Sequence, residues 1–239
     1  MKTKKLIKII LGVIIFFTLP SILLFGFVYF KYNEAMPTGA EGAKADALAT
    51  KMLDALNYEA YKNTDYLEWT FKNRRHYKWK KNNGICTVFW RNNKVELDFI
   101  NPEKSVVYID NIVISSSESK NLIEQANNYF NLDSFWLIGP YQVFEKGTKR
   151  RLISQTNKTP NLLVTHTSGD SYLWILDKNG KPTHCKIWAD YLPFGGLEAT
   201  WTDWTTMKNG ATLPTFHKLL LMGLEIKDLK TKQPKITNN

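Results

Sequence analysis

Cysteine and histidine are scarce in this sequence. Two cysteines in 239 residues exclude a small domain held together by disulfides and a cysteine-rich zinc module. The four histidines, His76, His166, His184 and His217, show none of the close pair spacings that are typical of metal sites. The sequence also lacks internal repeats and low-complexity tracts. We therefore expect no metal site, no other cofactor and no repeat architecture.

Aromatic residues, in contrast, are plentiful. They make up 13% of the chain and include eight tryptophans. Large apolar side chains in this number argue against disorder, because their burial offsets the entropy lost on ordering the chain. The length is sufficient for one sizeable domain with a true hydrophobic core.

The positive net charge of +10 is partly explained by lysines that flank a hydrophobic stretch. Without those five residues, 27 basic side chains face 22 acidic ones, which leaves a net charge of +5. A balance of this size fits solubility near an anionic membrane and is weak evidence for nucleic-acid binding. The lysines are Lys2, Lys4, Lys5, Lys8 and Lys31.

Residues 72–81 mix basic and aromatic side chains, a pattern that occurs where proteins grip nucleic acid. Strand alternation, however, directs Tyr77 and Trp79 inward while Lys78 and Lys80 face solvent. We interpret the segment as a solvated strand, with anionic lipid headgroups as an alternative contact. No nucleic-acid partner is expected.

The N-terminus carries a long apolar run. Residues 9–30 contain no charged side chain, and a helix of this length spans the hydrocarbon core of a bilayer. A cleaved signal peptide is the alternative, but its apolar region is shorter and ends in a small-residue site, which Phe30-Lys31-Tyr32-Asn33 does not provide. Residues 1–31 are therefore predicted to be an uncleaved transmembrane anchor, in which Pro20 is tolerated.

The lysines before this run favour a cytoplasmic N-terminus, so residues 32–239 are predicted to lie on the other side. The expected location is the inner membrane, crossed once, with a periplasmic domain. In that oxidising compartment Cys86 and Cys185 are candidates for a disulfide. Two buried free thiols are the other interpretation, since cysteine packs as a small apolar residue.

The remaining chain predicts a mainly β domain of the α+β class over residues 42–230, between a linker at 32–41 and a polar tail at 231–239. Apolar spacing of three and four predicts a helix over 42–62, and a second one near 117–131. Alternation with a period of two predicts strands from Leu67 to Phe99. Further strands are expected around 135–145, 149–155, 161–167, 171–177, 184–190, 196–203 and 215–229.

These elements, two helices and about ten strands, predict a curved antiparallel sheet, or half-barrel, with the helices packed on it. Residues 172–176 are apolar on both faces, which predicts a strand covered on both sides, for instance by a helix behind the sheet. A curled sheet leaves an apolar mouth where such folds hold ligands. Tryptophans are its candidate lining, with plain core packing as the alternative: Trp69, Trp79, Trp90, Trp136, Trp174, Trp188 and Trp201.

Catalysis has weaker candidates. Gly169-Asp170-Ser171 resembles the start of a lipase-type nucleophile block, but here the serine opens a strand instead of preceding a helix. A hydrolase that uses His166 or His217 with a carboxylate is a third hypothesis and requires these groups to share one cleft. We expect a protein without catalytic residues.

Three blocks carry a resemblance to a family of envelope proteins of the Bacteroidetes type, over roughly residues 42–225. They are DSFWL at 133–137 with PY at 140–141, GDSYLWILD at 169–177, and PFGGLEATW at 193–201. The order of elements also resembles the bacterial lipoprotein-carrier fold, an incomplete barrel closed by helices. That resemblance implies a site for acyl chains and no catalytic residues. Soluble carriers shuttle freely, whereas this chain has its own apolar helix.

The sequence therefore predicts a single-pass membrane protein whose periplasmic half-barrel binds a lipid or another hydrophobic ligand without chemistry. The expected partners are the membrane and lipid or lipoprotein acyl chains, while protein partners are left open. An envelope scaffolding or interaction module with a filled core and no ligand is the alternative.

Overall fold

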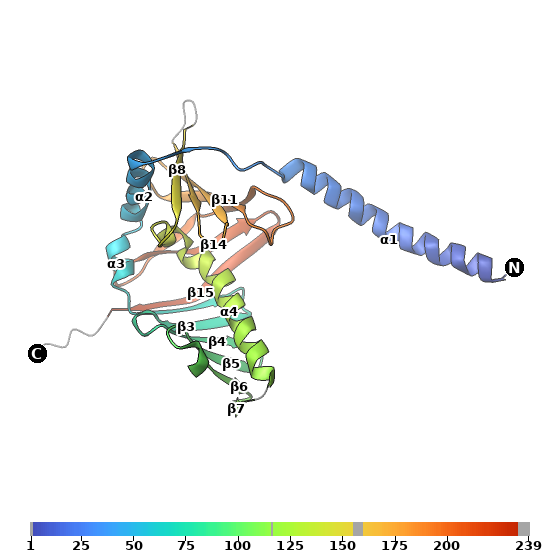
Figure 1. Ribbon diagram of the computed structural model, residues 1–239, viewed down its shortest axis with the longest axis horizontal. Helices are drawn as coiled ribbons and strands as arrows, with labels where there is room; N and C mark the ends of the chain where they lie inside the picture. Colours follow the sequence, from blue (N-terminus) through green and yellow to red (C-terminus); the bar gives the residue numbers. More distant parts are fainter. Residues whose placement is uncertain (1, 116, 155–159, 234–239) are drawn as a thin grey trace, which may run out of the picture.

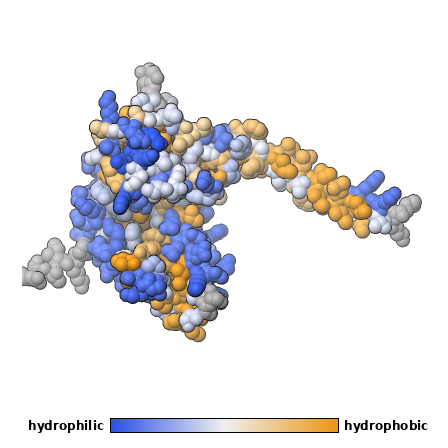
Figure 2. Space-filling model, viewed as in Figure 1, coloured by the Kyte–Doolittle hydropathy of each residue, from blue (hydrophilic) through white to orange (hydrophobic). Residues whose placement is uncertain are grey.

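The computed structural model describes residues 2–115, 117–154 and 160–233. Helix α1, Lys2–Tyr32, projects away from all other elements (Figure 1) and forms a continuous hydrophobic rod with hydrophilic residues at its N-terminal end (Figure 2). The segment Thr3–Tyr32 is long and apolar enough to cross a membrane, with a hydropathy of 2.6. A signal sequence near the N-terminus can also meet this criterion, so the membrane topology stays a prediction.

The strands form one antiparallel sheet from two halves of the chain. The first half is a meander of β2 (Tyr66–Phe71), β3 (Arg75–Lys80), β4 (Ile85–Trp90), β5 (Asn93–Asp98), β6 (Val106–Ile109) and β7 (Ile112–Ile114). The second half comprises β8 (Lys149–Ile153), β9 (Asn161–Thr165), β10 (Ser171–Leu176), β11 (Pro182–Trp188), β12 (Leu197–Thr200), β13 (Asp203–Thr206), β14 (Thr212–Leu219) and β15 (Met222–Lys232).

The two halves are joined through β15 and β2. Ile226 lies opposite Phe71, so β15, the last strand in the described residues, pairs with the first strand of the meander. The resulting order is β1-β8-β9-β10-β11-β12-β14-β15-β2-β3-β4-β5-β6-β7, with β1 at Ala40–Glu41 and β13 on the side of β14. This large antiparallel sheet with helices confirms the predicted α+β fold class.

Helices cover one face of the sheet. The longest of these covering helices, α4 (Ser117–Ile138), crosses that face from the β5–β6 region to β14 (Figure 1). The predicted helix at 42–62 occurs as α2 (Ala43–Ala55) and α3 (Tyr58–Lys62), because Asn57 between them adopts a left-handed conformation with φ 55°. Short 3-10 turns lie at Lys81–Asn83, Pro102–Lys104 and Gly139–Gln142.

Some predicted strands were wrong. No strand forms over 135–145: α4 continues to Ile138, a 3-10 turn follows over Gly139–Gln142, and residues 143–145 form a turn and a bend. The helical period was hidden because the last turn of α4 is buried on nearly all sides. The strand expected over 215–229 is the hairpin of β14 and β15. Strand β15 also extends through 231–232 of the predicted polar tail, and residues 234–239 lie outside the described part of the chain.

Strand β10 is covered on both faces, as its composition predicts. Tyr172 and Trp174 point into the main core, and Leu173 packs in a second, smaller cluster on the outer face with Ile153 and Leu163. The cover behind the sheet is not a helix but the linker after α1: Gly39 lies so close to Ile153 that an added Cβ would clash with Ile153 Cδ1. The linker therefore packs against the outer face of the sheet.

Candidate functional site

The interior between α4 and the sheet holds a first aromatic cluster. The rings of Trp136 in α4 and Trp201 after β12 stack with centroids 5.4 Å apart, and Trp174 in β10 meets Trp201 edge-on at 5.0 Å. Phe135 of α4 stacks on Tyr172 at 4.5 Å. The helix thus contributes two neighbouring aromatic side chains to one buried group. Offset and edge-on ring contacts of this kind add to the burial energy.

A second aromatic cluster lies beneath the middle of α4, on the meander half of the sheet. Phe130 of α4 contacts Trp79 edge-on at 5.3 Å and Phe99 at 4.9 Å. Trp69 stacks on Tyr77 with centroids 4.7 Å apart. Nearer the start of the helix, Trp90 meets Tyr129 at 5.5 Å. Six of the seven tryptophans predicted to line one pocket therefore form two interior groups.

Trp188 belongs to neither group. It packs against the outer cluster of Ile153, Leu163 and Leu173, and its indole nitrogen donates to the carbonyl oxygen of Glu34 at 2.8 Å. Its register explains this position, because Trp188 pairs with Ser171 while Trp174 pairs with Cys185 on the opposite face of the sheet. Trp188 therefore helps to attach the segment after α1 to the sheet and does not line the interior.

Four interior tryptophans share an unusual feature. Their indole N–H groups are buried and have no hydrogen-bond partner among the described residues: Trp69, Trp79, Trp174 and Trp201. A buried donor without a partner costs about 1–3 kcal/mol, so such groups are rare in folded proteins. The half-barrel interior thus carries hydrogen-bond donors as well as apolar surface.

A buried ion pair fixes α4 to the sheet between the two clusters. Asp133, 2% exposed, accepts hydrogen bonds from Arg75 Nε at 2.5 Å and Nη2 at 2.9 Å, and from the Tyr77 hydroxyl at 2.5 Å. Burial raises the pKa of Asp133, and both donors oppose that rise. Sequence reasoning missed this triad, although an acidic residue inside an aromatic helix segment was a usable signal.

One cavity opens beside the second cluster, between α3, α4 and β3. It has a volume of about 470 Å³ and is lined by aromatic side chains that include Tyr58, Tyr61, Trp79 and Phe130. A volume of this size lies within the range of small-molecule sites. Lys81 does not line the cavity but contacts one of its walls: its Nζ lies 4.3 Å from the Tyr61 ring centroid. Burial lowers the pKa of Lys81 to about 8. Aromatic walls with a cation nearby suit an amphipathic ligand.

His217 is placed for structure. It is fully buried in the first cluster, where Nε2 lies 2.7 Å from the carbonyl oxygen of Trp136 and Nδ1 lies 2.9 Å from that of Thr200. Burial lowers its pKa to about 4, against the effect of both carbonyls, so the ring is neutral at pH 7. The neutral ring has one N–H and can donate to only one of these two carbonyl oxygens, and neither is the carboxylate that the hydrolase hypothesis requires.

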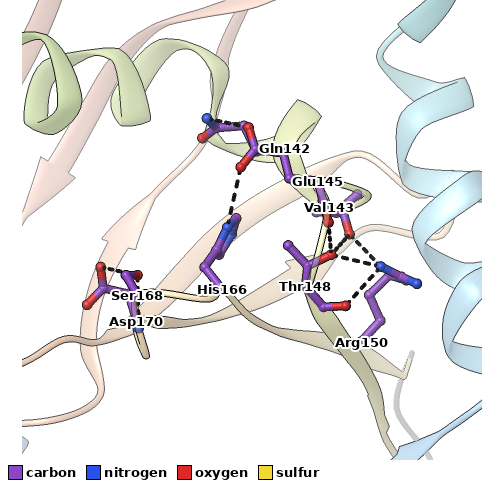
Figure 3. Close-up of polar contacts among 8 residues, drawn as sticks. All are labelled: Gln142, Val143, Glu145, Thr148, Arg150, His166, Ser168 and Asp170. Carbon is purple, nitrogen blue, oxygen red and sulfur yellow. Dashed lines mark hydrogen bonds and ion pairs between the residues drawn. The ribbon is translucent and has the colours of Figure 1, made fainter.

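His166 does have a carboxylate neighbour. Figure 3 shows its Nδ1 directed at Glu145, 3.7 Å away, with Gln142 donating to the same carboxylate at 2.9 Å. The Ser168 hydroxyl donates instead to Asp170 at 3.0 Å, and Ser171 is bonded to Thr165 at 2.9 Å. The serine hydroxyls are thus directed away from His166, and the nucleophile–base contact of a serine hydrolase is not formed here.

The cysteines are two separate buried thiols. Cys86 in β4 and Cys185 in β11 are both free and wholly inaccessible, an arrangement that corresponds to the thiol interpretation. Burial raises the pKa of each thiol above its usual value. Within the described ranges, no group of three or more His, Cys, Asp or Glu side chains could hold a metal ion.

Together these features define an α+β protein with a long apolar N-terminal helix and an aromatic interior under α4. Neither a protein-family model nor a curated protein sequence matches the chain. In structure it is similar to a LolA superfamily protein from Nitrosomonas europaea, with a TM-score of 0.41 and 13% identity, over 77% of this chain and 94% of that one. Membership of a Bacteroidetes-type envelope family stays a prediction.

Proposed function

We propose that this chain is a membrane-anchored, non-catalytic protein of the periplasm that binds the acyl chains of a lipid or lipoprotein between α4 and the sheet. The supporting observation is the set of four buried indole N–H groups without a partner in the described chain, which lie within apolar surroundings. Ester and amide carbonyls of an acylated ligand are the acceptors that such donors would pair with. Apolar surface and a few placed donors together are typical of lipid-sized sites.

Entry of a ligand requires α4 to move, because its aromatic side chains now occupy the interior. The cavity at Tyr61 and Trp79 provides a starting point, since it already separates the end of α4 from the sheet. The contact between Arg75 and Asp133 holds the helix in place. A ligand chain that replaced Phe130 or Phe135 against the sheet would keep the apolar surface covered while the helix is displaced.

The second candidate is an envelope scaffold whose interior is permanently filled. Trp69, Trp174 and Trp201 are at most 1% exposed, as expected of ordinary core residues. In that case the orphan indole groups are simply a cost of the fold. The two functions differ in one observable property, which is whether a lipid chain ever reaches the interior.

Photolabelling of the full chain tests this difference. The protein is reconstituted in phosphatidylcholine vesicles that contain a trace of phosphatidylcholine with a diazirine at the end of one acyl chain. After irradiation, labelled peptides are identified by mass spectrometry. Binding predicts labels in α4 and in the strands that carry Trp69 and Trp174, and competition by excess unlabelled lipid. Labels confined to α1 would favour the scaffold.

A matched pair of variants sharpens the test. Trp201→Phe keeps an aromatic ring but removes an unpartnered N–H, so interior labelling should fall several-fold. Trp188→Phe makes the same chemical change on the outer face, where the N–H already donates to Glu34. Interior labelling should be unchanged in this control. Equal effects of the two substitutions would argue against a role for the buried donors.

A further inference from the structure

The turn between β14 and β15 presents apolar side chains to its surroundings. Leu221 is 98% exposed, Met222 51% and Leu220 37%, so this is a group of adjacent large apolar residues at the tip of a hairpin. Single exposed leucines are common on protein surfaces, but adjacent ones at a protruding tip are typical of interaction sites.

The backbone of this turn makes its composition more unusual. Leu219 pairs with Met222, which leaves Leu220 and Leu221 as a two-residue loop. Leu220 has φ 53°, in the left-handed region that glycine, asparagine and aspartate occupy easily and leucine does not. Tight hairpin turns normally use those small or polar residues. Here an apolar residue is kept at a strained position, and strain of this kind is found at functional sites.

The tip lies beside the end of α1. A cavity of about 610 Å³ separates them and is lined by Leu24, Phe27 and Val28 of the helix and by Leu220 and Leu221 of the hairpin. Figure 1 shows the β14–β15 hairpin pointing toward the side of the molecule from which α1 projects. The hairpin tip is therefore level with the last turns of the apolar helix.

Contacts after α1 fix this arrangement. Glu34, two residues past the helix, accepts two hydrogen bonds of 2.7 Å from Lys186, and its backbone N–H donates to Gly195 at 2.9 Å. The side-chain oxygen of Asn33 accepts a hydrogen bond from the Gly195 backbone at 2.9 Å. These hydrogen bonds fix the first residues after α1 to the sheet half of the domain. The β14–β15 turn therefore has a defined position relative to the end of α1.

Helix geometry gives the depth of the tip. At a rise of about 1.5 Å per residue, Phe27 lies roughly 7 Å and Leu24 roughly 12 Å before the end of α1 at Tyr32. Apolar groups of peripheral proteins insert about 5–10 Å into a bilayer interface. A tip level with Phe27 falls within that depth.

The charges around the cavity fit a headgroup layer. Glu34 and Glu198 both lie against Lys186, at 2.7 and 3.7 Å, so their carboxylates are offset by a basic neighbour. Lys218 lines the cavity beside the apolar tip, and Lys31 lies in the last turn of α1. Lysines at this level are well placed to reach lipid phosphates while the leucines enter the acyl region.

We propose that Leu220, Leu221 and Met222 insert into the leaflet from which α1 emerges, as a second membrane contact that holds the sheet in one orientation. This inference rests on the proposed membrane anchoring by α1, and it is independent of ligand binding under α4. The occupant of the apolar tip is the acyl region of the bilayer itself. An anchor plus an inserted tip restricts tilting of the sheet toward or away from the bilayer.

Fluorescence quenching in vesicles tests the proposal. Leu221→Cys in the full chain is labelled with the environment-sensitive dye NBD, and the fully buried Cys86 and Cys185 leave the new thiol as the reactive one. The control is Ile112→Cys, an equally apolar residue that is 67% exposed at the far edge strand β7. Both are reconstituted in phosphatidylcholine vesicles containing phosphatidylcholine with a nitroxide at carbon 5 of one chain.

The proposal expects several-fold stronger quenching at position 221 than at 112, with a blue-shifted emission. If quenching were equal at positions 221 and 112 in a chain that resists extraction by alkaline carbonate, the proposal of an inserted tip would be overturned. The proposed anchoring by α1 would still hold. Release of the chain by carbonate would overturn the anchor and the inserted tip together. Interior photolabelling is read separately and is not changed by either result.

Discussion

Asp133 in α4 is held by Arg75 in β3 through two hydrogen bonds of 2.5 and 2.9 Å. The pair joins the helix that fills the interior to the sheet that surrounds it. Because the Asp133 side chain is only 3% exposed, its charge depends on this partner for stabilisation.

Removal of the arginine should therefore be costly. Arg75→Gln leaves the Asp133 carboxylate buried without a cationic partner, and we expect a loss of about 3 kcal/mol in the free energy of unfolding. Urea denaturation followed by circular dichroism measures this loss in the detergent-solubilised chain.

The exposed pair of Lys62 and Glu59 provides the control. These side chains are 60% and 71% exposed at a distance of 3.8 Å, so Glu59→Gln should change stability by less than about 1 kcal/mol. If Arg75→Gln had as small an effect as this control, α4 would not depend on the buried pair.

Stability should fall between about pH 6.5 and pH 4 because of His217. Burial lowers its pKa from 6.5 to about 4, so the unfolded chain binds this proton at a higher pH than the folded chain does. Stability is then fully present above the unfolded pKa and decreases as the pH falls, by about 3 kcal/mol for this group. Denaturation curves at a series of pH values measure the slope.

His217→Gln separates this group from other titrations. The variant should be less stable at pH 7, but its free energy of unfolding should fall less than that of the wild type over the same pH interval. Glu68 titrates in a lower window: burial alone would raise its pKa, but hydrogen bonds from Lys230 and Tyr66 lower it from 4.5 to about 2. An unchanged slope in His217→Gln would show that His217 is not the group that destabilises the fold.

A methyl group at Gly195 should loosen the joint between α1 and the sheet. A Cβ there would lie 2.5 Å from the Trp188 ring and 3.0 Å from the carbonyl oxygen of Glu34. We expect Gly195→Ala to displace the linker and to increase cleavage after Glu34 by Glu-C protease several-fold. Thr38→Ala, at an exposed linker position, is the matched control and should be cut at the original rate.

Both thiols should be unreactive in the folded chain. Cys86 and Cys185 are inaccessible, and burial raises their pKa so that little thiolate forms. Iodoacetamide should leave the native chain unmodified and should alkylate both thiols in guanidinium chloride without reductant. A denatured chain that accepts no label before reduction would instead contain the disulfide.

Sequence periodicity predicted most of the strands because alternation of apolar and polar residues is a local property. The same local pattern did not identify the end of α4. Phe135 to Ile138 is a short apolar run, and such a run is compatible with either a strand or a buried helix. The β14–β15 turn was missed because Leu220-Leu221 contains none of the usual turn residues. The β6–β7 hairpin does have a local signal: its turn is Asp110-Asn111, both with positive φ, and these are typical turn residues.

The site was harder to predict, because it depends on register. Trp174 and Trp188 look equivalent in the sequence, yet pairing with Cys185 and Ser171 respectively sends them to opposite faces. The contact of Arg75 with Asp133 joins residues 58 positions apart, so the sequence around Asp133 marks a buried charge but does not identify its partner. The assembled sheet decides which tryptophans lie together in the interior. Patterns within a single sequence do not show this register.

The pairing of β15 with β2 has a consequence for how the chain matures. Residues 66–71 leave the ribosome early but gain their second neighbour only after residues 226–232 have been made. If α1 is already inserted at that time, the meander must wait at the membrane surface with one edge open. Unpaired edges and long sequence separations slow folding and favour aggregation. Addition of the eleven-residue strand β15 is therefore the step that joins the two halves of the sheet. Truncations that remove part of β15 should impair biogenesis more than their small size suggests.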